Sequence, residues 1–287
     1  MSNYVIYTDS ACDAGAELLK SWGVYSSSLT FRFDGEEKEY SNEDMAVSEF
    51  YDKMRSGGIA RTSAVNVATF LDEFEKLLKQ GQDILYLGFA APLSATYNSA
   101  AMAAEQLREQ YPERKIITVD TLCASSGQAL LIYQTVEKKN AGASIEEAAA
   151  FAEDQKKHVC HWITVDDLVY LKRGGRIRPT TALVGKALGI KPLIRIDGKG
   201  KLESSGKARG RKKAIQALAD KYSELVEEPG SSVFITHSEC LEEAQELAKI
   251  LKERHNADTQ LIADIGPVVG AHIGPGGIVF SFVGKER

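Results

Sequence analysis

The sequence predicts an α/β protein built from two domains, and three features of the chain carry that prediction. Short apolar runs rich in β-branched residues alternate with amphipathic helical patterns, which is typical of βαβ units around a largely parallel sheet. The length of 287 residues exceeds that of a typical single domain. The regular alternation gives way to a mixed pattern near residues 156–161. We therefore expect a parallel-sheet α/β/α domain over residues 1–157 and a mixed-sheet α/β domain over residues 158–287.

The strands are predicted from continuous apolar runs, because strands buried on both faces of a parallel sheet do not alternate with polar residues. The helices are predicted where apolar residues recur at i, i+3 and i+4 spacing. In chain order, the predicted strands cover residues 4–8, 84–88, 115–119, 232–236 and 259–263, and the predicted helices cover residues 67–78, 100–110, 145–156, 214–225 and 241–254.

Two segments outside this alternation of strands and helices are predicted as β-hairpins. Residues 24–40 carry an Asp34-Gly35 turn after an apolar run, and residues 190–204 turn at Asp197-Gly198. Asp-Gly between two strand-like runs is a strong short-range signal for a hairpin.

Composition and charge exclude several classes of protein. The chain is 44% hydrophobic and 26% charged, as globular proteins are, and its net charge of -5 does not recruit nucleic acid. No apolar run approaches the roughly 18 residues of a membrane span, and no secretory signal is visible at the N-terminus. We therefore expect a cytoplasmic protein without integral membrane association. Its four scattered cysteines are expected to be reduced thiols: Cys12, Cys123, Cys160 and Cys240.

The motifs of common enzymes and metal sites are missing. The chain has no GxxxxGK[ST] phosphate loop, no HExxH helix and no GxSxG elbow. His158, Cys160 and His161 have metal-like spacing, but on a strand His161 faces away from the other two. We therefore favour ordinary packing over a zinc site and expect no bound metal.

Hydroxyl-rich segments follow several predicted strands. Residues 8–10, 94–99 and 120–126 lie after strands, and Arg61-Thr62-Ser63 precedes the helix predicted from residue 67. The carboxyl ends of parallel strands, together with helix N-termini, suit an anionic ligand. The alternative is helix capping, since Ser and Thr are cap residues. The sequence leaves both interpretations open.

Two further segments allow either a structural or a binding role. Residues 266–277 are dense in glycine and contain His272, which is either a turn residue bonded to the backbone or a donor to a bound anion. Basic residues gather at 172–178 and 207–213. A solvated face is the simplest interpretation of these basic stretches, with an acidic partner second and RNA third. Aromatic residues do not interleave with them, which weakens the case for nucleic acid.

These segments, in this order, resemble the DegV family of bacterial fatty-acid-binding proteins over about residues 3–284. The segments that carry the resemblance are Thr8-Asp9-Ser10 with Cys12-Asp13, Thr62-Ser63, Ser94 with Thr96 and Asn98-Ser99, Asp120-Thr121, residues 171–177, Ile190-Lys191-Pro192, residues 209–213 and residues 272–276.

The resemblance implies a two-domain α/β fold that holds a long-chain fatty acid, such as palmitate, where the domains meet. The family pattern places the carboxylate at Thr62 and Ser94, with His272 nearby. We add Ser63 and Thr96, from the same two motifs, to the predicted ligand-binding residues. Some members bind the acid for a separate fatty acid kinase, and the basic residue that contacts the kinase matches Arg209. No other cofactor and no catalytic residue is implied.

The energetics of a fatty acid are consistent with such a carrier. About 14 methylenes at ~0.8 kcal/mol each contribute roughly 11 kcal/mol when buried, so the tail dominates the affinity. Uncharged hydroxyls satisfy the carboxylate and leave it accessible to a partner enzyme. The main alternative is an enzyme in which His272 activates a Ser or Thr for acyl transfer or hydrolysis, although no acidic neighbour orients this histidine in the sequence. A regulatory, nucleic-acid-binding module is the third interpretation.

Overall fold

The computed structural model describes residues 4–177 and 189–287. The first half of the chain forms a four-stranded sheet in the order β2-β1-β5-β6, and every pair in it is parallel. Its strands are β1 (Tyr4–Asp9), β2 (Val24–Ser27), β5 (Asp83–Gly88) and β6 (Ile116–Asp120). The three predicted strands of this half are confirmed to within one residue at each end.

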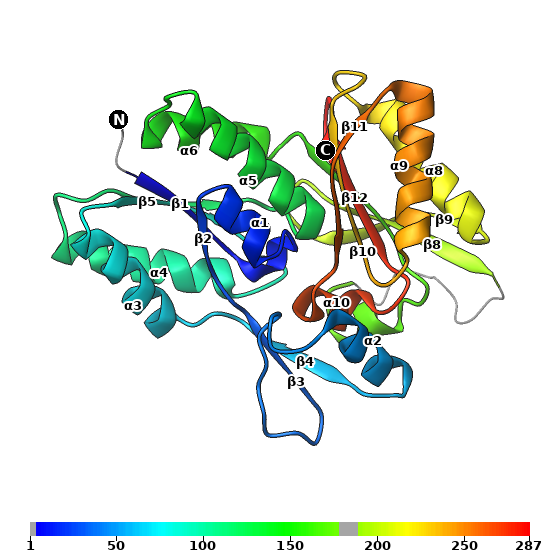
Figure 1. The fold of residues 1–287 in the computed structure, drawn as a ribbon, viewed down its shortest axis with the longest axis horizontal. Helices are drawn as coiled ribbons and strands as arrows, with labels where there is room; N and C mark the ends of the chain where they lie inside the picture. The colour runs from blue at the N-terminus through cyan, green and yellow to red at the C-terminus, as the bar shows by residue number, and fades with distance from the viewer. Residues whose placement is uncertain (1–3, 178–188) are drawn as a thin grey trace.

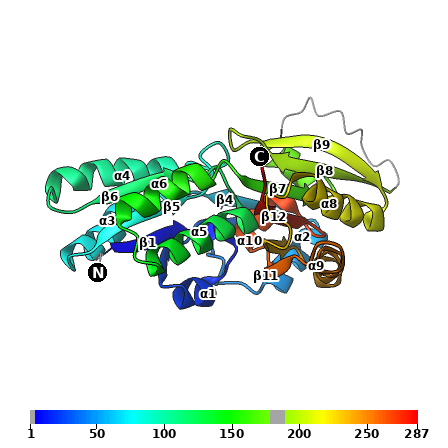
Figure 2. The same cartoon turned by 90° about the horizontal axis from the view of Figure 1, so that it is seen from above.

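Helices cover both faces of this parallel sheet (Figures 1 and 2). Tyr7 and Tyr86 pack on one side with α3 (Val67–Lys79) and α4 (Thr96–Gln110). Ile6 and Leu85 point to the other side. That side is covered by α1 (Ala16–Ser21), α5 (Ser125–Asn140) and α6 (Ile145–Gln155). Both faces are buried, which is why these strands read as unbroken apolar runs.

The second half forms a six-stranded mixed sheet in the order β11-β10-β12-β7-β8-β9. Only β10 and β11 pair in parallel. The strands are β7 (Val159–Thr164), β8 (Ile190–Ile196), β9 (Leu202–Arg209), β10 (Ser232–His237), β11 (Asp258–Asp264) and β12 (Ile278–Val283). One face packs on α8 (Arg211–Leu225) and α9 (Leu241–His255), and the other contacts α5. Helix α5 therefore lies between the two large sheets.

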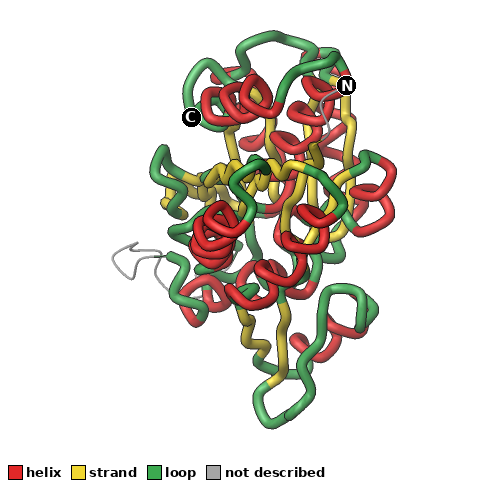
Figure 3. The backbone as a smooth tube through the Cα atoms, turned by 90° about the vertical axis from the view of Figure 1, so that its left-hand side faces the viewer, coloured by secondary structure: helices red, strands yellow, loops and turns green. Residues whose placement is uncertain are grey.

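A third, two-stranded sheet lies apart from the large ones, at the lower end of the view in Figure 3. Strands β3 (Thr30–Phe33) and β4 (Ala60–Ser63) pair antiparallel in it. Helix α10 (Pro267–Ile273) packs on these strands and on α2 (Val47–Arg55) and α7 (Val169–Arg173). A short 3-10 turn, Ser10–Cys12, completes the regular structure. The arrangement brings β4 from the first half against α10 from the end of the chain.

The hairpin prediction is right for one segment and wrong for the other. Strands β8 and β9 form the hairpin predicted over residues 190–204. Residues 24–40 do not form a hairpin, because β2 joins β1 in the parallel sheet and β3 pairs with β4. A single bridge between Phe31 and Tyr40 remains of the expected pairing. Residues 37–39 are charged and exposed, so they cannot cover the buried rings of Phe31 and Phe33 as a paired strand would.

The strands of the four-stranded sheet all precede residue 157, and those of the six-stranded sheet all follow residue 158. The predicted domain boundary falls between α6 and β7 and stays a prediction. Apolar side chains of both halves share one buried cluster, in which Phe70 and Tyr86 belong to the same packing unit as Ile163 and Val268. None of the helices in the described ranges is long and apolar enough to cross a membrane.

Candidate functional site

A cavity of about 200 Å³ lies where α10 meets β4 and the ends of the large sheets. Its walls are mostly apolar and come from both halves of the chain. Phe89 and Leu93 follow β5, whereas Ile163, Ile196 and Val279 belong to β7, β8 and β12. We call this space the apolar cavity. Its polar lining residues are Thr62, Ser94, Ser125, Arg176 and His272.

Thr62 and His272 form a hydrogen-bonded pair at the cavity wall. The Nε2 atom of His272 lies 2.9 Å from Oγ1 of Thr62, although the two residues are 210 positions apart in sequence. The other ring nitrogen, Nδ1, is buried and has no hydrogen-bond partner among the described residues. A buried N–H without an acceptor costs more than an empty lone pair, which places the proton of the neutral ring on Nε2. His272 then donates to Thr62, and the Thr62 hydroxyl proton is free to point at a ligand.

His272 is neutral at physiological pH. Burial, and to a smaller extent the positive charge of Arg176, lower its pKa to about 4. The ring packs so tightly against Gly174 that a Cβ atom there would lie 2.1 Å from Nδ1. Glycine at position 174 is therefore a steric requirement for this placement of the ring.

Ser94 lies on the turn between β5 and α4, and Thr96 contacts it through two hydrogen bonds. Their hydroxyl oxygens are 2.9 Å apart, and the Thr96 N–H donates to Ser94 Oγ over 3.3 Å. Thr96 also accepts a bond from the Val65 N–H, so it links the Ser94 turn to the segment that carries Thr62. Thr96 is buried and does not line the apolar cavity. Ser63 ends β4 with an exposed side chain and does not line the cavity either.

Arg176 is a cavity residue that the sequence analysis did not single out. Its Nε donates to the Leu93 carbonyl over 3.1 Å and one terminal nitrogen donates to the Gly174 carbonyl over 2.6 Å. The side chain is half-buried, and this burial lowers its pKa. No carboxylate of the described chain lies within ion-pair distance of it, which leaves the site with an uncompensated positive charge. We expected only uncharged donors for the carboxylate. The structure adds the guanidinium of Arg176 to the polar groups that line the cavity.

The glycine-rich segment 266–277 is only partly the loop that its composition suggests. Residues 267–273 form α10, and His272 lies in its last turn rather than in a turn between elements. Pro at the first helical position favours a helix start there, and this signal was available in the sequence. Of the two alternatives for His272, the turn residue bonded to the backbone is therefore wrong.

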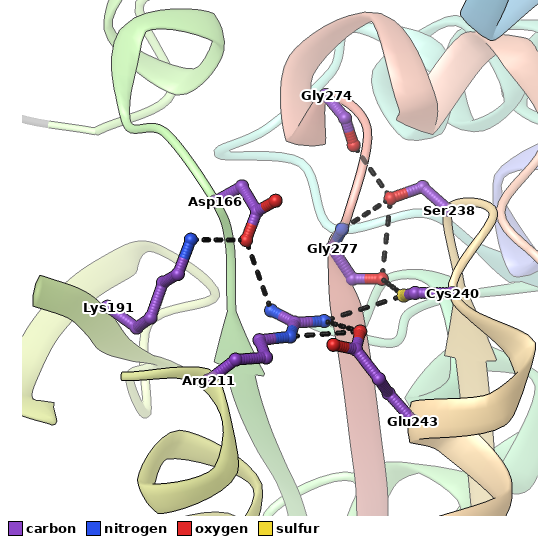
Figure 4. Close-up of polar contacts among 8 residues, drawn as sticks. All are labelled: Asp166, Lys191, Arg211, Ser238, Cys240, Glu243, Gly274 and Gly277. Atoms are coloured by element: carbon purple, nitrogen blue, oxygen red, sulfur yellow. Dashed lines mark hydrogen bonds and ion pairs between the residues drawn. The ribbon is translucent and has the colours of Figure 1, made fainter. Parts of the chain in front are cut away.

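A polar network holds the segment that follows His272, as Figure 4 shows. Ser238 Oγ donates to the Gly274 carbonyl over 2.7 Å and accepts a bond from the Gly277 N–H over 2.6 Å. Arg211 contacts Glu243 at 2.9 Å and Asp166 at 3.7 Å. Lys191 and Cys240 complete the network through Asp166 and the Gly277 carbonyl. Part of the second basic stretch, Arg211, therefore belongs to an internal network instead of a solvated face.

The remaining candidates lie away from the cavity. Arg209 is exposed at the end of β9. The side chain of His161 packs against Gly127, and burial holds the pKa of His161 well below its usual range. His158 contacts the Gly284 carbonyl. Within residues 4–177 and 189–287, no group of three metal-ligating side chains comes together.

Comparison with known proteins places the chain in a family. The DegV family model matches residues 3–285. The chain belongs to the DegV family. A DegV domain-containing protein of Clostridium perfringens is 39% identical over 289 residues, covering 100% of this chain and 99% of that protein.

Solved structures of similar proteins have the same fold. A DegV lipid-binding protein from Thermotoga maritima superposes with a TM-score of 0.88 at 28% identity, covering 100% of both chains. A stearic acid-binding protein from Eubacterium ventriosum gives 0.87 at 28% identity and covers 98% of each chain. These matches confirm the α/β fold with a parallel and a mixed sheet.

Proposed function

We propose that this DegV protein binds a long-chain fatty acid in the apolar cavity and carries it without changing it. The observation that supports the proposal most is the make-up of the cavity: apolar walls from both halves, with the hydroxyls of Thr62, Ser94 and Ser125 and an uncompensated guanidinium among them. The Thermotoga and Eubacterium proteins, described as lipid-binding and stearic acid-binding, support the same ligand class. In this proposal the cavity is the junction of the two predicted domains.

The tail and the head of the acid are held by different forces. Each buried methylene contributes about 0.8 kcal/mol, so the apolar walls supply most of the affinity. The carboxylate needs hydrogen bonds that replace water, because an unpaired buried charge is costly. Thr62 and Ser94 donate their hydroxyl protons, and Arg176 supplies a charge-assisted contact. Neutral His272 aligns Thr62 without adding a second positive charge.

Replacing Ser94 tests the head-group site. Ser94→Ala removes one donor to a charged acceptor, a contact worth about 1.5–3 kcal/mol, so we expect retention of palmitate to fall by roughly tenfold or more. Exchange of a fluorescent fatty acid measures the affinity, and mass spectrometry of organic extracts identifies the acid carried by the purified protein. Ser205→Ala is the control, because Ser205 is exposed on β9. Unchanged affinity in Ser94→Ala would contradict the site.

Presentation of the acid to a fatty acid kinase is the second part of the proposal. Arg209 is exposed and does not line the cavity, so its replacement can change partner contact without changing lipid binding. We expect Arg209→Ala to keep its fatty-acid content while its cognate kinase phosphorylates the bound acid more slowly, by roughly tenfold if one charged contact is lost. Lys252→Ala, an exposed site on α9, is the control. Equal rates for Arg209→Ala and the parent would remove Arg209 from the partner surface.

Acyl transfer remains the competing function, because the contact between His272 and Thr62 has the geometry of a base and a nucleophile. Two features weigh against it. No acidic side chain of the described chain bonds to Nδ1 of His272, and the pKa of about 4 makes the ring a weak base at neutral pH. Incubation with an acyl ester separates the two functions: a carrier gives no product, whereas turnover lost in Thr62→Val would favour the enzyme.

A further inference from the structure

The third hydroxyl residue of the apolar cavity, Ser125, lies at the same edge of the parallel sheet as Ser94. Ser94 follows β5 and Ser125 follows β6, and these two strands are neighbours. The Ala90 N–H donates to the Cys123 carbonyl over 3.0 Å, which ties together the two segments that follow the strands. Both serines line the apolar cavity, so both can meet the carboxylate that we place beside Ser94.

Buried hydrogen bonds hold the side chain of Ser125. Its Oγ atom lies 2.6 Å from Oδ2 of Asp13 and 2.7 Å from Oγ1 of Thr236, and all three side chains are buried. The other oxygen of Asp13, Oδ1, accepts the Gly266 N–H over 3.0 Å. The backbone of Ser125 has a φ of 50°, in the left-handed region that serine rarely adopts. These contacts therefore keep a serine at this position against its backbone preference.

The direction of the hydrogen bond between Asp13 and Ser125 depends on the charge of the carboxyl group. An ionised carboxylate only accepts, so it takes the single hydroxyl proton of Ser125. A protonated Asp13 donates to Ser125 from Oδ2, because Oδ1 already accepts the Gly266 N–H. With Thr236 donating to the second lone pair of Ser125, the hydroxyl proton of Ser125 is then free to point into the cavity.

We propose that Asp13 is a positioning residue, which lets Ser125 donate a hydrogen bond to the bound acid only while Asp13 is protonated. The inference rests on the proposed function and adds regulation by pH to it. While Asp13 is ionised, Ser125 presents only a lone pair to the cavity, whereas a carboxylate needs donors. Burial raises the pKa of Asp13 to about 8, so the change falls just above neutral pH.

Asp13 can exchange its proton with solvent without passing the bound acid, because it also lines a second cavity. This polar cavity has a volume of about 300 Å³ and is separate from the lining of the apolar cavity. Glu43 and Asp264 line it together with Asp13, and both are exposed. The carboxyl group of Asp13 therefore lies between a solvent-facing cavity and the hydroxyl of Ser125, which faces the ligand.

The charged surroundings of Asp13 favour its protonated form. The titratable side chains that face it are Cys12, Glu43, Tyr51 and Asp264. Cys12 and Tyr51 stay neutral because burial raises the pKa of each, and the negative charge of Asp264 raises the pKa of Asp13. Helices α5 and α10 contact Asp13 through Ser125 and the Gly266 N–H. No cationic side chain of the described residues forms an ion pair with Asp13 that would keep it ionised.

The test is the pH profile of palmitate affinity between about pH 6.5 and pH 9.5. Monomeric palmitate, which is ionised throughout this range, competes with a fluorescent fatty acid whose own affinity is measured at each pH. We expect the affinity of the parent to fall by roughly tenfold as the pH rises, because one donor to a charged acceptor is lost. Hexadecanol can donate as well as accept, so its affinity should stay constant. An equal fall for both ligands would reflect loss of the fold and would overturn the proposal.

Two substitutions reproduce the two states of Ser125. Asp13→Asn places an amide N–H toward Ser125 and a carbonyl oxygen toward the Gly266 N–H, as protonated Asp13 does. We expect it to keep the low-pH affinity of the parent up to about pH 9.5. Ser125→Ala has no hydroxyl, so we expect it to bind palmitate at every pH as weakly as the parent does at about pH 9.5.

Asp264→Asn is the matched control, because Asp264 is exposed and does not line the apolar cavity. It should keep the fall in affinity and move its midpoint to lower pH, since Asp264 raises the pKa of Asp13. The proposal is overturned if the palmitate affinity of the parent does not depend on pH, if Asp13→Asn follows the parent profile, or if Ser125→Ala keeps the low-pH affinity. The parent profile and Ser125→Ala decide the matter even if Asp13→Asn does not fold. Failure of palmitate to bind the parent at every pH overturns the proposed function, and this regulation with it.

Discussion

Arg176 shows at the scale of one residue how a proposed binding site can oppose stability. The guanidinium is half-buried, and its burial lowers its pKa because the charged form loses water. Among the described residues it bonds only to two backbone carbonyls, and none of their acidic groups offsets this cost. Such an unpaired charge can stabilise a bound anion, but it does not stabilise the ligand-free fold.

Replacing Arg176 tests whether its charge opposes stability. Arg176→Gln should leave the melting temperature of the lipid-free protein unchanged or raise it, while palmitate binding falls by roughly tenfold. Arg176→Lys is the matched variant, because it keeps the charge and loses the planar fork, and we expect an intermediate affinity. Thermal unfolding of delipidated protein and lipid exchange are the two measurements. A large drop in melting temperature with unchanged affinity would assign Arg176 to the fold alone.

At the scale of elements, the N-terminus of α10 is tied to the first half of the chain by Asp13. Its carboxylate accepts the Gly266 N–H over 3.0 Å and the Ser125 hydroxyl over 2.6 Å. The side chain therefore joins the end of the first 3-10 turn to α5 and α10. Burial has the largest effect on the ionisation of Asp13 and raises its pKa to about 8. The two hydrogen bonds favour the charged form, but their effect is smaller.

This shift predicts how stability depends on pH. Between about pH 4, the ordinary value for an aspartate, and pH 8 the folded protein holds a proton at Asp13 that the unfolded chain releases. Asp13 therefore stabilises the fold below this window, and its contribution falls as the pH rises through it. Urea unfolding of the parent and of Asp13→Asn at several pH values measures the effect. The difference in unfolding free energy between them should change across the window in the direction of a less stable parent at high pH, and a constant difference would contradict the shift.

At the scale of the whole molecule, the buried clusters cross the predicted domain boundary. The cluster around the apolar cavity contains Tyr86 from the first half and Val268 from the second. Trp22 likewise packs near Phe234, with ring centroids 6.5 Å apart. Two halves that share their cores lose packing together, so we expect them to unfold as one cooperative unit.

The chain offers two internal reporters for this cooperativity, because Trp22 and Trp162 are its only tryptophans. Trp162→Phe leaves the reporter of the first half, and Trp22→Phe leaves the reporter of the second. The urea midpoints followed by fluorescence in each variant should coincide with those followed by circular dichroism in the same variant. A bound fatty acid at 100 times its dissociation constant should raise the unfolding free energy by about 2.7 kcal/mol in both variants. Separate midpoints for the two probes would show that the halves unfold independently.

The hydroxyl residues illustrate how far motifs lead toward a site. The motif order pointed to Thr62, Ser94 and His272, and these three do line one cavity. Ser63 and Thr96 belong to the same motifs, yet one is exposed and the other is buried behind Ser94. Strand β4 directs alternate side chains to opposite sides, so only one of two adjacent hydroxyls can face the cavity. A sequence motif does not specify which of two adjacent side chains faces the cavity.

Local patterns in the sequence were enough to determine the alternation of strands and helices, the parallel first sheet and the β8–β9 hairpin, because these depend on periodicity and turn residues within a short stretch. Arg176, the pairing of β3 with β4 and the contact between Thr62 and His272 were decided only by the tertiary structure. Each of these depends on which surfaces of distant segments become buried together. Burial, more than residue type, turns one arginine of a basic stretch into the charge at the wall of the apolar cavity.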